Sequence, residues 1–461
     1  MVFSSSIFIF CFLPLLFLFY FCLPKKCKNV VLLIFSLVFY AFGGVNYLFT
    51  LLLTVFISYL GGILIEKYNS KKKFILFLTV GLNLLFLIYF KYTGFILDNI
   101  NNIFKVGIDI PSIIMPIGIS FYTFQSISYV VDVYKKEVGV QKNYFLLLLY
   151  VSLFPQLVAG PIVRYQTVEH EIEKRTTTLD DFCYGLERFI LGLAKKVIIA
   201  NQMGKLADIV FSDTSFTTPV VWLGAIAYMM QIYFDFSAYS DMAIGLGRIL
   251  GFKFLENFNF PYIAKSITDF WRRWHISLST FFRDYVYIPL GGNRCSKFRQ
   301  IFNMSVVWFL TGFWHGANYN FILWGLYYLV FLILEKYVFK NIIERIPNIL
   351  RHILTLLIVL IGWMLFRLED LSVFKDVIVS MFNFNITSVS LSEARIYVET
   401  YFVYFILAFI FSTPIYYVVC DKLKKYKVFE VLKYIGLLVL FIITIMFLAQ
   451  SSYNPFIYFR F

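Results

Sequence analysis

Two histidines lie inside long apolar stretches of the chain. His275 occurs in the segment DFWRRWHISLST of residues 269–280, and His315 occurs in LTGFWHGANY of residues 310–319. A titratable imidazole at membrane depth costs folding free energy that a leucine would not, so such a residue is by default a candidate for a functional site. Both histidines are therefore candidates for proton transfer in catalysis.

The surroundings of His315 favour a general base. The basic stretch before it is typical of a cytoplasmic loop, and a helix rising from there at about 1.5 Å per residue carries His315 about 24 Å across a hydrocarbon core of about 30 Å. In such a helix Thr311 and Asn318 share one face with His315. Gly312 and Gly316 leave room for a neighbouring backbone or a ligand. A base with a hydroxyl, an amide and open space beside it suits proton abstraction from a bound substrate.

Each histidine also has a plain structural interpretation. His315 could be a hydrogen-bonded packing residue, and the arginines and tryptophans beside His275 would also suit an anchor at the membrane interface. His170 lies in a charged loop and His352 follows an arginine at a helix start, so we expect both to be ordinary. We place catalysis on His315 first and on His275 second.

The elements that position these histidines are expected to be membrane helices. The chain is 60% hydrophobic, 21% aromatic and only 15% charged, with a mean hydropathy of +0.77, which is typical of a bilayer protein. Apolar runs recur along its whole length and predict an all-α polytopic membrane protein with roughly 11 to 13 transmembrane or re-entrant helices. The first run lacks a basic region and a cleavage site, so we expect a retained helix. No linker is visible, so residues 1–461 are expected to form a single integral-membrane domain.

Helix breakers inside the apolar runs predict a cavity or tunnel at the centre of this bundle. They are Pro111, Pro116 and Gly118, and then the segment FPQLVAGP of residues 154–161. Irregular backbone at membrane depth is tolerated where protein buries it or water reaches it. Each break alone could equally be an ordinary kink, but several together favour the tunnel.

Carboxylates in the middle of the chain need partners of opposite charge. Asp235 and Asp241 lie in an otherwise apolar run, and Arg248 follows about two helical turns after Asp241. We expect an internal ion pair between these residues that fixes helix packing. The charges around His275 are expected to lie at the membrane interface, where they contact head groups or snorkel.

The net charge of +14 does not indicate a nucleic-acid-binding protein. Lysines and arginines fall in short loops between the apolar runs, which is the positive-inside pattern of membrane proteins. Their placement predicts that the N-terminus and the tail of residues 451–461 lie outside the cytoplasm. The same loops could in addition attract an anionic cytoplasmic substrate.

No sequence motif for a metal or a nucleotide cofactor is present. The six cysteines are scattered and none has the spacing of zinc ligands, so we expect no metal site. No phosphate-binding glycine loop and no fixed-period repeat occurs.

Eight segments of the chain form a pattern that points to a known family. They are residues 1–5, 115–125, 154–161, 235–241, 270–275, 287–294, 313–316 and 453–461. Together they resemble the membrane-bound O-acyltransferase (MBOAT) family, and within it the bacterial branch that O-acetylates alginate and peptidoglycan. The resemblance covers essentially the whole chain, and both histidine motifs fit the family pattern without departure.

The resemblance implies acyl transfer inside a membrane tunnel. His315 occupies the family's catalytic histidine position and His275 its second polar position. The implied donor is acetyl-CoA on the cytoplasmic side of a bacterial inner membrane, with no permanently bound cofactor. The implied acceptor is an extracytoplasmic glycan, reached with an esterase-like partner transferase of the SGNH type. We favour peptidoglycan over alginate-like or other exopolysaccharides.

Two further hypotheses follow from these residues. A transporter of a lipid-linked sugar or acyl donor would also use broken helices and midplane polar groups, but it would not need a histidine between glycines. The tail sequence FIYFRF of residues 456–461 has the pattern F-x-Y-x-x-F, which in related D-alanine transfer systems occurs on a small partner peptide. Tyr458 is therefore a candidate acyl shuttle, with an interfacial aromatic anchor as the alternative.

Overall fold

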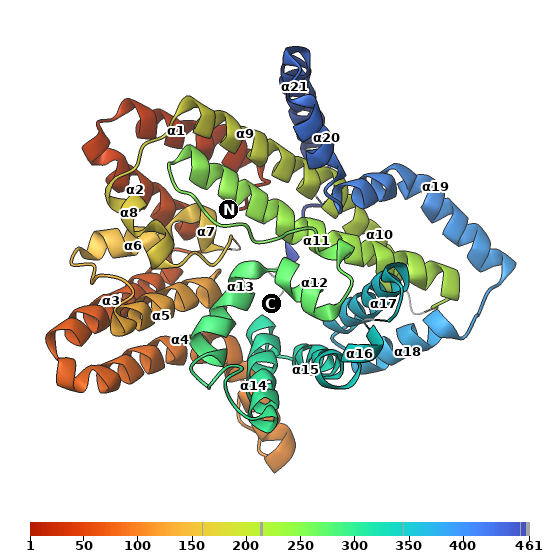
Figure 1. Ribbon diagram of the computed structural model, residues 1–461, viewed down its shortest axis with the longest axis horizontal. Helices are drawn as coiled ribbons and strands as arrows, with labels where there is room; N and C mark the ends of the chain where they lie inside the picture. The colour runs from red at the N-terminus through yellow and green to blue at the C-terminus, as the bar shows by residue number, and fades with distance from the viewer. Residues whose placement is uncertain (159, 213–214, 344, 452, 458–461) are drawn as a thin grey trace. The chain divides into compact units, whose positions relative to one another are not determined.

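The computed structural model describes residues 1–158, 160–212, 215–343, 345–451 and 453–457. It is 78% helical, and the described residues contain no β-strand (Figure 1). The all-α membrane fold expected from the sequence is confirmed. Among the described residues, seven helices are long and apolar enough to cross a membrane, and a shorter apolar helix spans Phe8–Cys22. The seven are Asn46–Lys67, Asn69–Phe104, Thr218–Ile249, Tyr319–Val338, Asn348–Arg367, Ser388–Phe411 and Lys427–Gln450.

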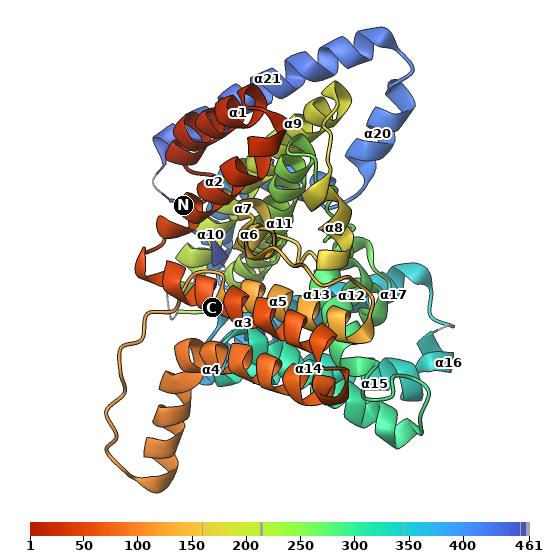
Figure 2. The same ribbon diagram turned by 90° about the vertical axis from the view of Figure 1, so that its left-hand side faces the viewer.

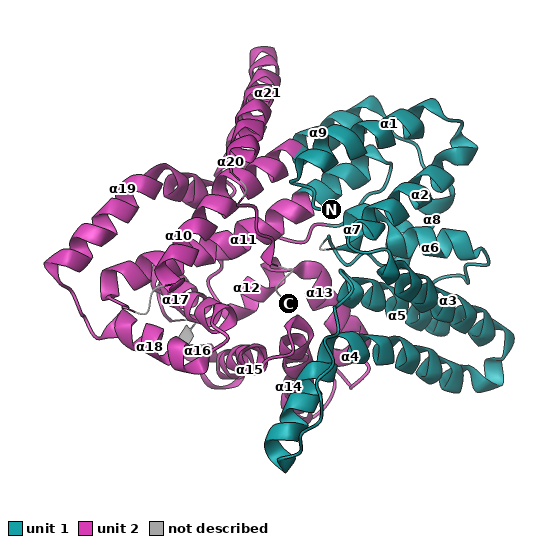
Figure 3. Cartoon of the chain, turned by 180° about the vertical axis from the view of Figure 1, so that it is seen from behind, with its two compact units in different colours: residues 1–189, 242–255 teal, residues 190–241, 256–461 magenta. Residues whose placement is uncertain are grey.

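The chain divides into two compact units, coloured separately in Figure 3. Unit 1 comprises residues 1–189 and 242–255, and unit 2 comprises residues 190–241 and 256–461. The helices of unit 1 are α1 (Leu13–Cys22), α2 (Lys28–Ala41), α3 (Asn46–Lys67), α4 (Lys72–Phe104), α5 (Ile119–Lys135), α6 (Tyr144–Ser152), α7 (Phe154–Leu157), α8 (Tyr165–Glu173) and most of α9 (Leu179–Ala194).

Close contacts and one arginine hold unit 1 together. Arg175 donates hydrogen bonds to the Tyr20 hydroxyl, the Asn29 side chain and the Leu250 carbonyl, and so connects three distant parts of the chain. The predicted helix breakers of residues 111–118 belong to an extended, largely exposed segment that returns from the end of α4 (Figure 2). Gly118 has φ +75°, a conformation that favours glycine, and packs against the Leu157 carbonyl.

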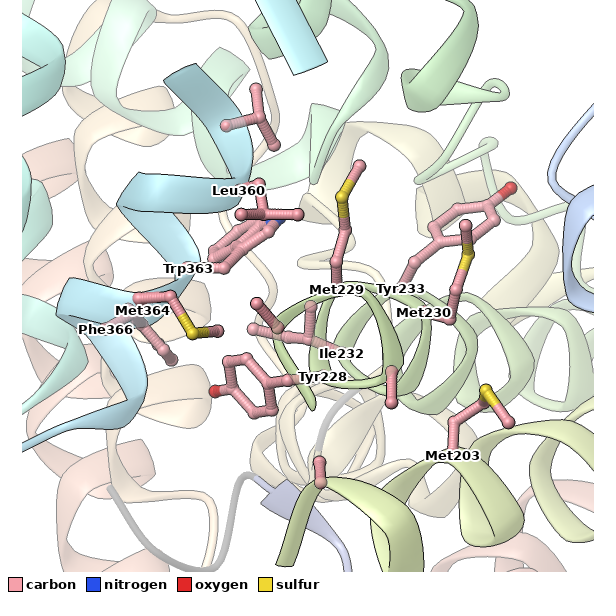
Figure 4. Packing of buried hydrophobic residues seen from close by; sticks show 14 of the residues in the cluster. Met203, Tyr228, Met229, Met230, Ile232, Tyr233, Leu360, Trp363, Met364 and Phe366 are labelled. Carbon is pink, nitrogen blue, oxygen red and sulfur yellow. The ribbon is translucent and has the colours of Figure 1, made fainter. Parts of the chain in front are cut away.

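Unit 2 is built around residues 218–241 of α11 (Thr218–Ile249) and around α17 (Asn348–Arg367). Figure 4 shows Tyr228 and Ile232 of α11 facing Trp363 and Met364 of α17 within a cluster of buried hydrophobic residues. Unit 2 also contains η4 (Lys195–Ala200), α10 (Asn201–Ser212), α12 (Ile267–Arg273), α13 (Ile276–Phe282), α14 (Lys297–His315), α15 (Tyr319–Ile333), α16 (Lys340–Ile343), α18 (Leu371–Phe382), α19 (Ser388–Phe411), α20 (Ile415–Leu423) and α21 (Lys427–Gln450).

The carboxylates of α11 have partners other than the one expected. Lys195 pairs with Asp241 at 3.0 Å and Lys196 pairs with Asp235, whereas Arg248 pairs with Asp181 at 2.7 Å. The prediction of an Asp241–Arg248 pair was therefore wrong. Both lysines lie in the π-helical turn η4, and two adjacent residues of this turn reach one neighbouring helix.

Candidate active site

Both candidate histidines line one cavity of about 500 Å³ in unit 2. His275 is 5% exposed and His315 is 8% exposed, so each side chain is buried apart from the part that faces this cavity. The two histidines are 40 residues apart in the sequence, and the fold brings both of them to the lining of this cavity. The remaining lining residues are Thr268, Trp271, Arg272, Trp274, Ile276, Leu278, Ser279, Thr280, Phe282, Arg283, Val307, Trp308, Thr311 and Leu332.

His315 is the last residue of α14 and lies among aromatic rings. Its ring centroid is 5.0 Å from that of Trp324 and 5.2 Å from that of Phe366, both nearly edge-on, and 4.9 Å from that of Trp314. These rings restrict the orientation of the imidazole. The helix dipole places its negative end at the last turn of α14, where a positive charge is stabilised by about 0.3–1 kcal/mol. A base that becomes cationic during catalysis benefits from this position.

A glycine contact brings α15 against α14 next to His315. A Cβ atom on Gly312 would overlap the Phe321 carbonyl oxygen, and one on Gly325 would lie 3.3 Å from the Gly312 Cα. The space expected beside His315 is therefore filled at Gly312 by a neighbouring backbone. This close approach is what places Trp324 of α15 against the His315 ring.

The prediction that Thr311 and Asn318 share a helical face with His315 is correct for Thr311 only. Thr311 lines the cavity, and its hydroxyl donates to the Val307 carbonyl at 2.8 Å. Asn318 does not share the helix, because α14 ends at His315 with Gly316 as its extended C-cap, and Asn318 is instead the N-cap of α15. The amide near the site is that of Asn320, which donates to the Phe366 carbonyl at 3.1 Å and holds α17 in place.

His275 connects α12 and α13 in a strained conformation. Its φ of +43° is rare for a residue with a Cβ atom. The imidazole caps α13, since Nδ1 accepts a hydrogen bond from the Leu278 backbone N–H at 3.4 Å. The following turn is fixed by Asn257, whose carbonyl accepts from the Ile276 N–H and whose side chain accepts from Ser277.

The chemistry of His275 follows from its surroundings. Burial lowers the pKa of His275 from 6.5 to about 3, so the ring is neutral near neutral pH. A neutral imidazole that accepts at Nδ1 carries its proton on Nε2. His275 is thus suited to donate a hydrogen bond to an oxygen atom in the cavity, and His315 remains the residue suited to act as base.

Arginines and hydroxyl groups lie along the α12–α13 side of the cavity. Arg272 is exposed, and the Arg283 guanidinium pairs with the Asp284 carboxylate at 2.6 Å. Ser279 and Thr280 add polar groups to the lining. The sequence interpretation missed Trp308 and both hydroxyl residues, because their cavity-facing position depends on how α13 and α14 pack.

The described residues contain no group of three or more His, Cys, Asp or Glu side chains that could hold a metal ion. Tyr458, the third residue predicted for the site, lies outside the described residues. The residues that precede it, 453–457, belong to unit 2 and contact η4, α10 and α11 of that unit.

A family model connects this cavity with known proteins. The model of MBOAT, the membrane-bound O-acyltransferase family, matches residues 135–366, about half of the chain, and this range contains both histidines and every residue that lines the cavity. The chain belongs to the membrane-bound O-acyltransferase family. As an MBOAT protein it is an acyltransferase, which decides against the alternative of a transporter without chemistry of its own.

MBOAT relatives extend the similarity over most of the chain. The probable alginate O-acetylase AlgI of Pseudomonas aeruginosa is 44% identical over 392 residues, which cover 83% of this chain and 75% of that protein. The protein of the same name from Pseudomonas putida is 39% identical over 485 residues, which cover 100% of both chains. The peptidoglycan O-acetyltransferase of Helicobacter pylori is 36% identical over 423 residues, which cover 84% of this chain and 80% of that protein.

Proposed function

We propose that this MBOAT protein transfers acetyl groups from cytoplasmic acetyl-CoA for the O-acetylation of an extracytoplasmic glycan. The observation that carries the proposal is that His315, at the end of α14, and His275, at the start of α13, line the same cavity. One residue is suited to accept a proton and the other to donate a hydrogen bond. Acyl transfer from a thioester needs both functions and needs no metal or enzyme nucleophile.

The proposed reaction assigns one step to each histidine. His315 takes the proton of an acceptor hydroxyl while the oxygen of that hydroxyl attacks the thioester carbonyl of acetyl-CoA. The carbonyl oxygen becomes negative, and the Nε2–H of His275 stabilises that charge by a hydrogen bond. The C–S bond then breaks, coenzyme A leaves as its thiolate and takes the proton from His315, and the acetyl ester remains on the acceptor oxygen.

The acceptor class is supported by the relatives, which are named for alginate and for peptidoglycan. Peptidoglycan remains our prediction from the sequence, and alginate-like polysaccharide is the alternative. An esterase-like partner of the SGNH type would carry the acetyl group to the final sugar. The expected location is the bacterial inner membrane, with both termini outside the cytoplasm. Assays of the two glycans from the same cells decide which of them is acetylated.

Tyr458 gives the proposal a second step. A phenol has a pKa of about 10, so a base activates it more easily than a sugar hydroxyl, and phenolate is also the better leaving group. Under this proposal Tyr458 accepts the acetyl group first and hands it to the partner transferase. The alternative is that Tyr458 only anchors the tail at the membrane interface.

The test is His315→Ala, with His170→Ala as a matched control. His170 is exposed and lies on α8, not in the loop expected from the sequence. Loss of a general base is expected to slow acetyl-CoA turnover by the purified protein by about 10²- to 10⁴-fold. The amount of protein in the membrane should stay near that of the parent, and His170→Ala should retain the parent's rate. Turnover by His315→Ala at the parent's rate would contradict the assignment.

A further inference from the structure

A buried ion pair binds the backbone of the C-terminal tail. Lys196 donates from Nζ both to the Asp235 carboxylate and to the Pro455 carbonyl. The other oxygen of Asp235 accepts from the Ile457 backbone N–H at 2.9 Å. The two charged side chains are only 5% and 1% exposed. We call Lys196 and Asp235 the tail clamp.

The tail clamp and the tail complete each other's hydrogen bonds. The bonds form a closed ring from the ammonium group through the carboxylate to the residue 457 N–H, and back along the tail to the residue 455 carbonyl. Without the tail, a buried ammonium proton and a buried carboxylate oxygen would each lose a partner. A hydrogen bond to a charged group stabilises by more than one between neutral groups, so these two bonds favour the docked tail.

Side chains of the tail add contacts on either side of the tail clamp. The Phe456 ring stacks on Tyr239 with 4.9 Å between centroids. Asn201 donates to the Asn454 side chain at 3.2 Å. The Tyr453 hydroxyl donates to Asp208. The tail is therefore held in one register, because a shift by one residue would break the backbone bonds and the side-chain contacts together.

The docked tail is also connected to a ring that packs against His315. Asp208, which accepts from the tail, pairs with Arg367 at 2.8 Å at the end of α17. The residue before Arg367 is Phe366, whose ring packs edge-on against His315. The tail is thus joined to the element that orients the proposed base.

We propose that Lys196 and Asp235 are positioning residues for acyl transfer. They fix the backbone of residues 455–457, which directly precede Tyr458, the candidate acyl shuttle of the proposed function. This inference rests on the proposed function of the chain. The new element is that a buried ion pair holds the tail in register through hydrogen bonds to the tail backbone.

An ion pair serves this purpose better than an apolar contact. Buried pairs contribute little net stability compared with apolar residues of similar volume, but they demand specific partners at specific positions. An apolar groove would let the tail slide by a residue at low cost. The bonds to residues 455 and 457 do not allow this.

The experiment separates docking of the tail from catalysis. The clamp variant Lys196→Met/Asp235→Leu replaces both charges with apolar side chains, which avoids leaving one charge buried alone. Its matched control is Lys195→Met/Asp241→Leu, which removes the neighbouring ion pair of η4 and α11. Each is combined with Asn201→Cys/Asn454→Cys, and a short thiol cross-linker reports how often the tail is docked. The same proteins without the added cysteine pair give the background from the six native cysteines.

The expected result is a loss of docking in the clamp variant only. Cross-linking should slow by about 10-fold for each charge-assisted bond lost, and acetylation of the glycan should fall with it. Once cross-linked, the clamp variant should regain most of its transfer activity, because the covalent link replaces the clamp. Parent-like cross-linking by the clamp variant would overturn the proposal, and so would a cross-linked variant that stays inactive.

A tail variant covers the case in which the clamp variant does not fold. Ile457→Pro removes the N–H that Asp235 binds, whereas Ile457→Val keeps it. The proline variant should dock poorly and the valine variant should dock like the parent, and equal docking of the two would overturn the proposal. Cross-linking is measured without substrate, so it remains informative even if the chain transfers no acetyl group.

Discussion

The glycine contact between α14 and α15 makes a quantitative prediction about catalysis. A methyl group on Gly312 would overlap the Phe321 carbonyl oxygen and would lie 3.3 Å from the Ile322 Cα. Favourable carbon contacts begin at about 3.5 Å, so Gly312→Ala is expected to push the two helices apart by up to about 1 Å. His315 is carried by one helix and Trp324 by the other, so the substitution moves the base relative to the ring that orients it.

The magnitudes decide between two opposing effects. Replacing glycine by alanine inside a helix stabilises it by about 0.5–1 kcal/mol, whereas forcing a methyl group into a packed contact costs about 1–3 kcal/mol. The net expectation is a loss of about 1 kcal/mol in the free energy of unfolding. A misplacement of about 1 Å costs about 10²-fold in rate, so activity should fall far more than stability.

The assay compares Gly312→Ala with Gly436→Ala. Gly436 lies in α21, and a methyl group there would meet nothing within 4 Å, so this control carries the helix-propensity gain without the overlap. Thermal unfolding in detergent and acetyl-CoA turnover are measured for both proteins. The reasoning is refuted if Gly312→Ala keeps both the stability and the turnover of the Gly436→Ala control.

Three further predictions concern pH, the donor side and the tail. The pKa of His275 is lower in the folded chain than in the unfolded chain, so below pH 6.5 the unfolded chain binds more protons. Between pH 6.5 and about 3, the free energy of unfolding should therefore fall by about 1.4 kcal/mol for each unit by which the pH falls. His275→Asn keeps a residue that tolerates positive φ and caps a helix, so its unfolding temperature should fall less between about pH 7 and about pH 5; equal slopes would contradict the lowered pKa. In oriented vesicles, acetyl-CoA should be consumed only from the cytoplasmic face and less at high salt, and consumption from the outer face would show the topology to be wrong. Tyr458→Phe keeps the ring and removes the oxygen, so it should stop glycan acetylation. Mass spectrometry of the parent protein without its partner transferase should find an acetyl group on Tyr458. Full glycan acetylation by the variant would leave the interfacial anchor as the remaining role for Tyr458.

Much of the membrane architecture could be predicted from the sequence because the bilayer imposes simple rules. Long apolar runs had to be helices, since no other element satisfies its own backbone in hydrocarbon. For the same reason His275 and His315 were visible as candidates, because a polar residue in an apolar run is costly and needs an explanation. Lys195 and Lys196 carry the same signal, because they are charged residues inside the apolar stretch of residues 182–200.

Tertiary structure decided which residues meet. Arg248 is two helical turns from Asp241 in sequence, yet Asp241 pairs with Lys195 and Arg248 pairs with Asp181. Ion pairs depend on how neighbouring helices are rotated and displaced. Asn318 left the face of His315 because α14 ends at that histidine, and helix ends depend on capping and on the contacts of the next helix.

The site itself shows the same division. The sequence determined that the chain has two histidines able to move protons, since that is a property of residue type and burial. Only the folded chain put them on one cavity, lowered the pKa of His275, and bound the tail through a buried ion pair. These features arise from contacts between segments tens to hundreds of residues apart, and residue spacing along the chain carries no record of such contacts.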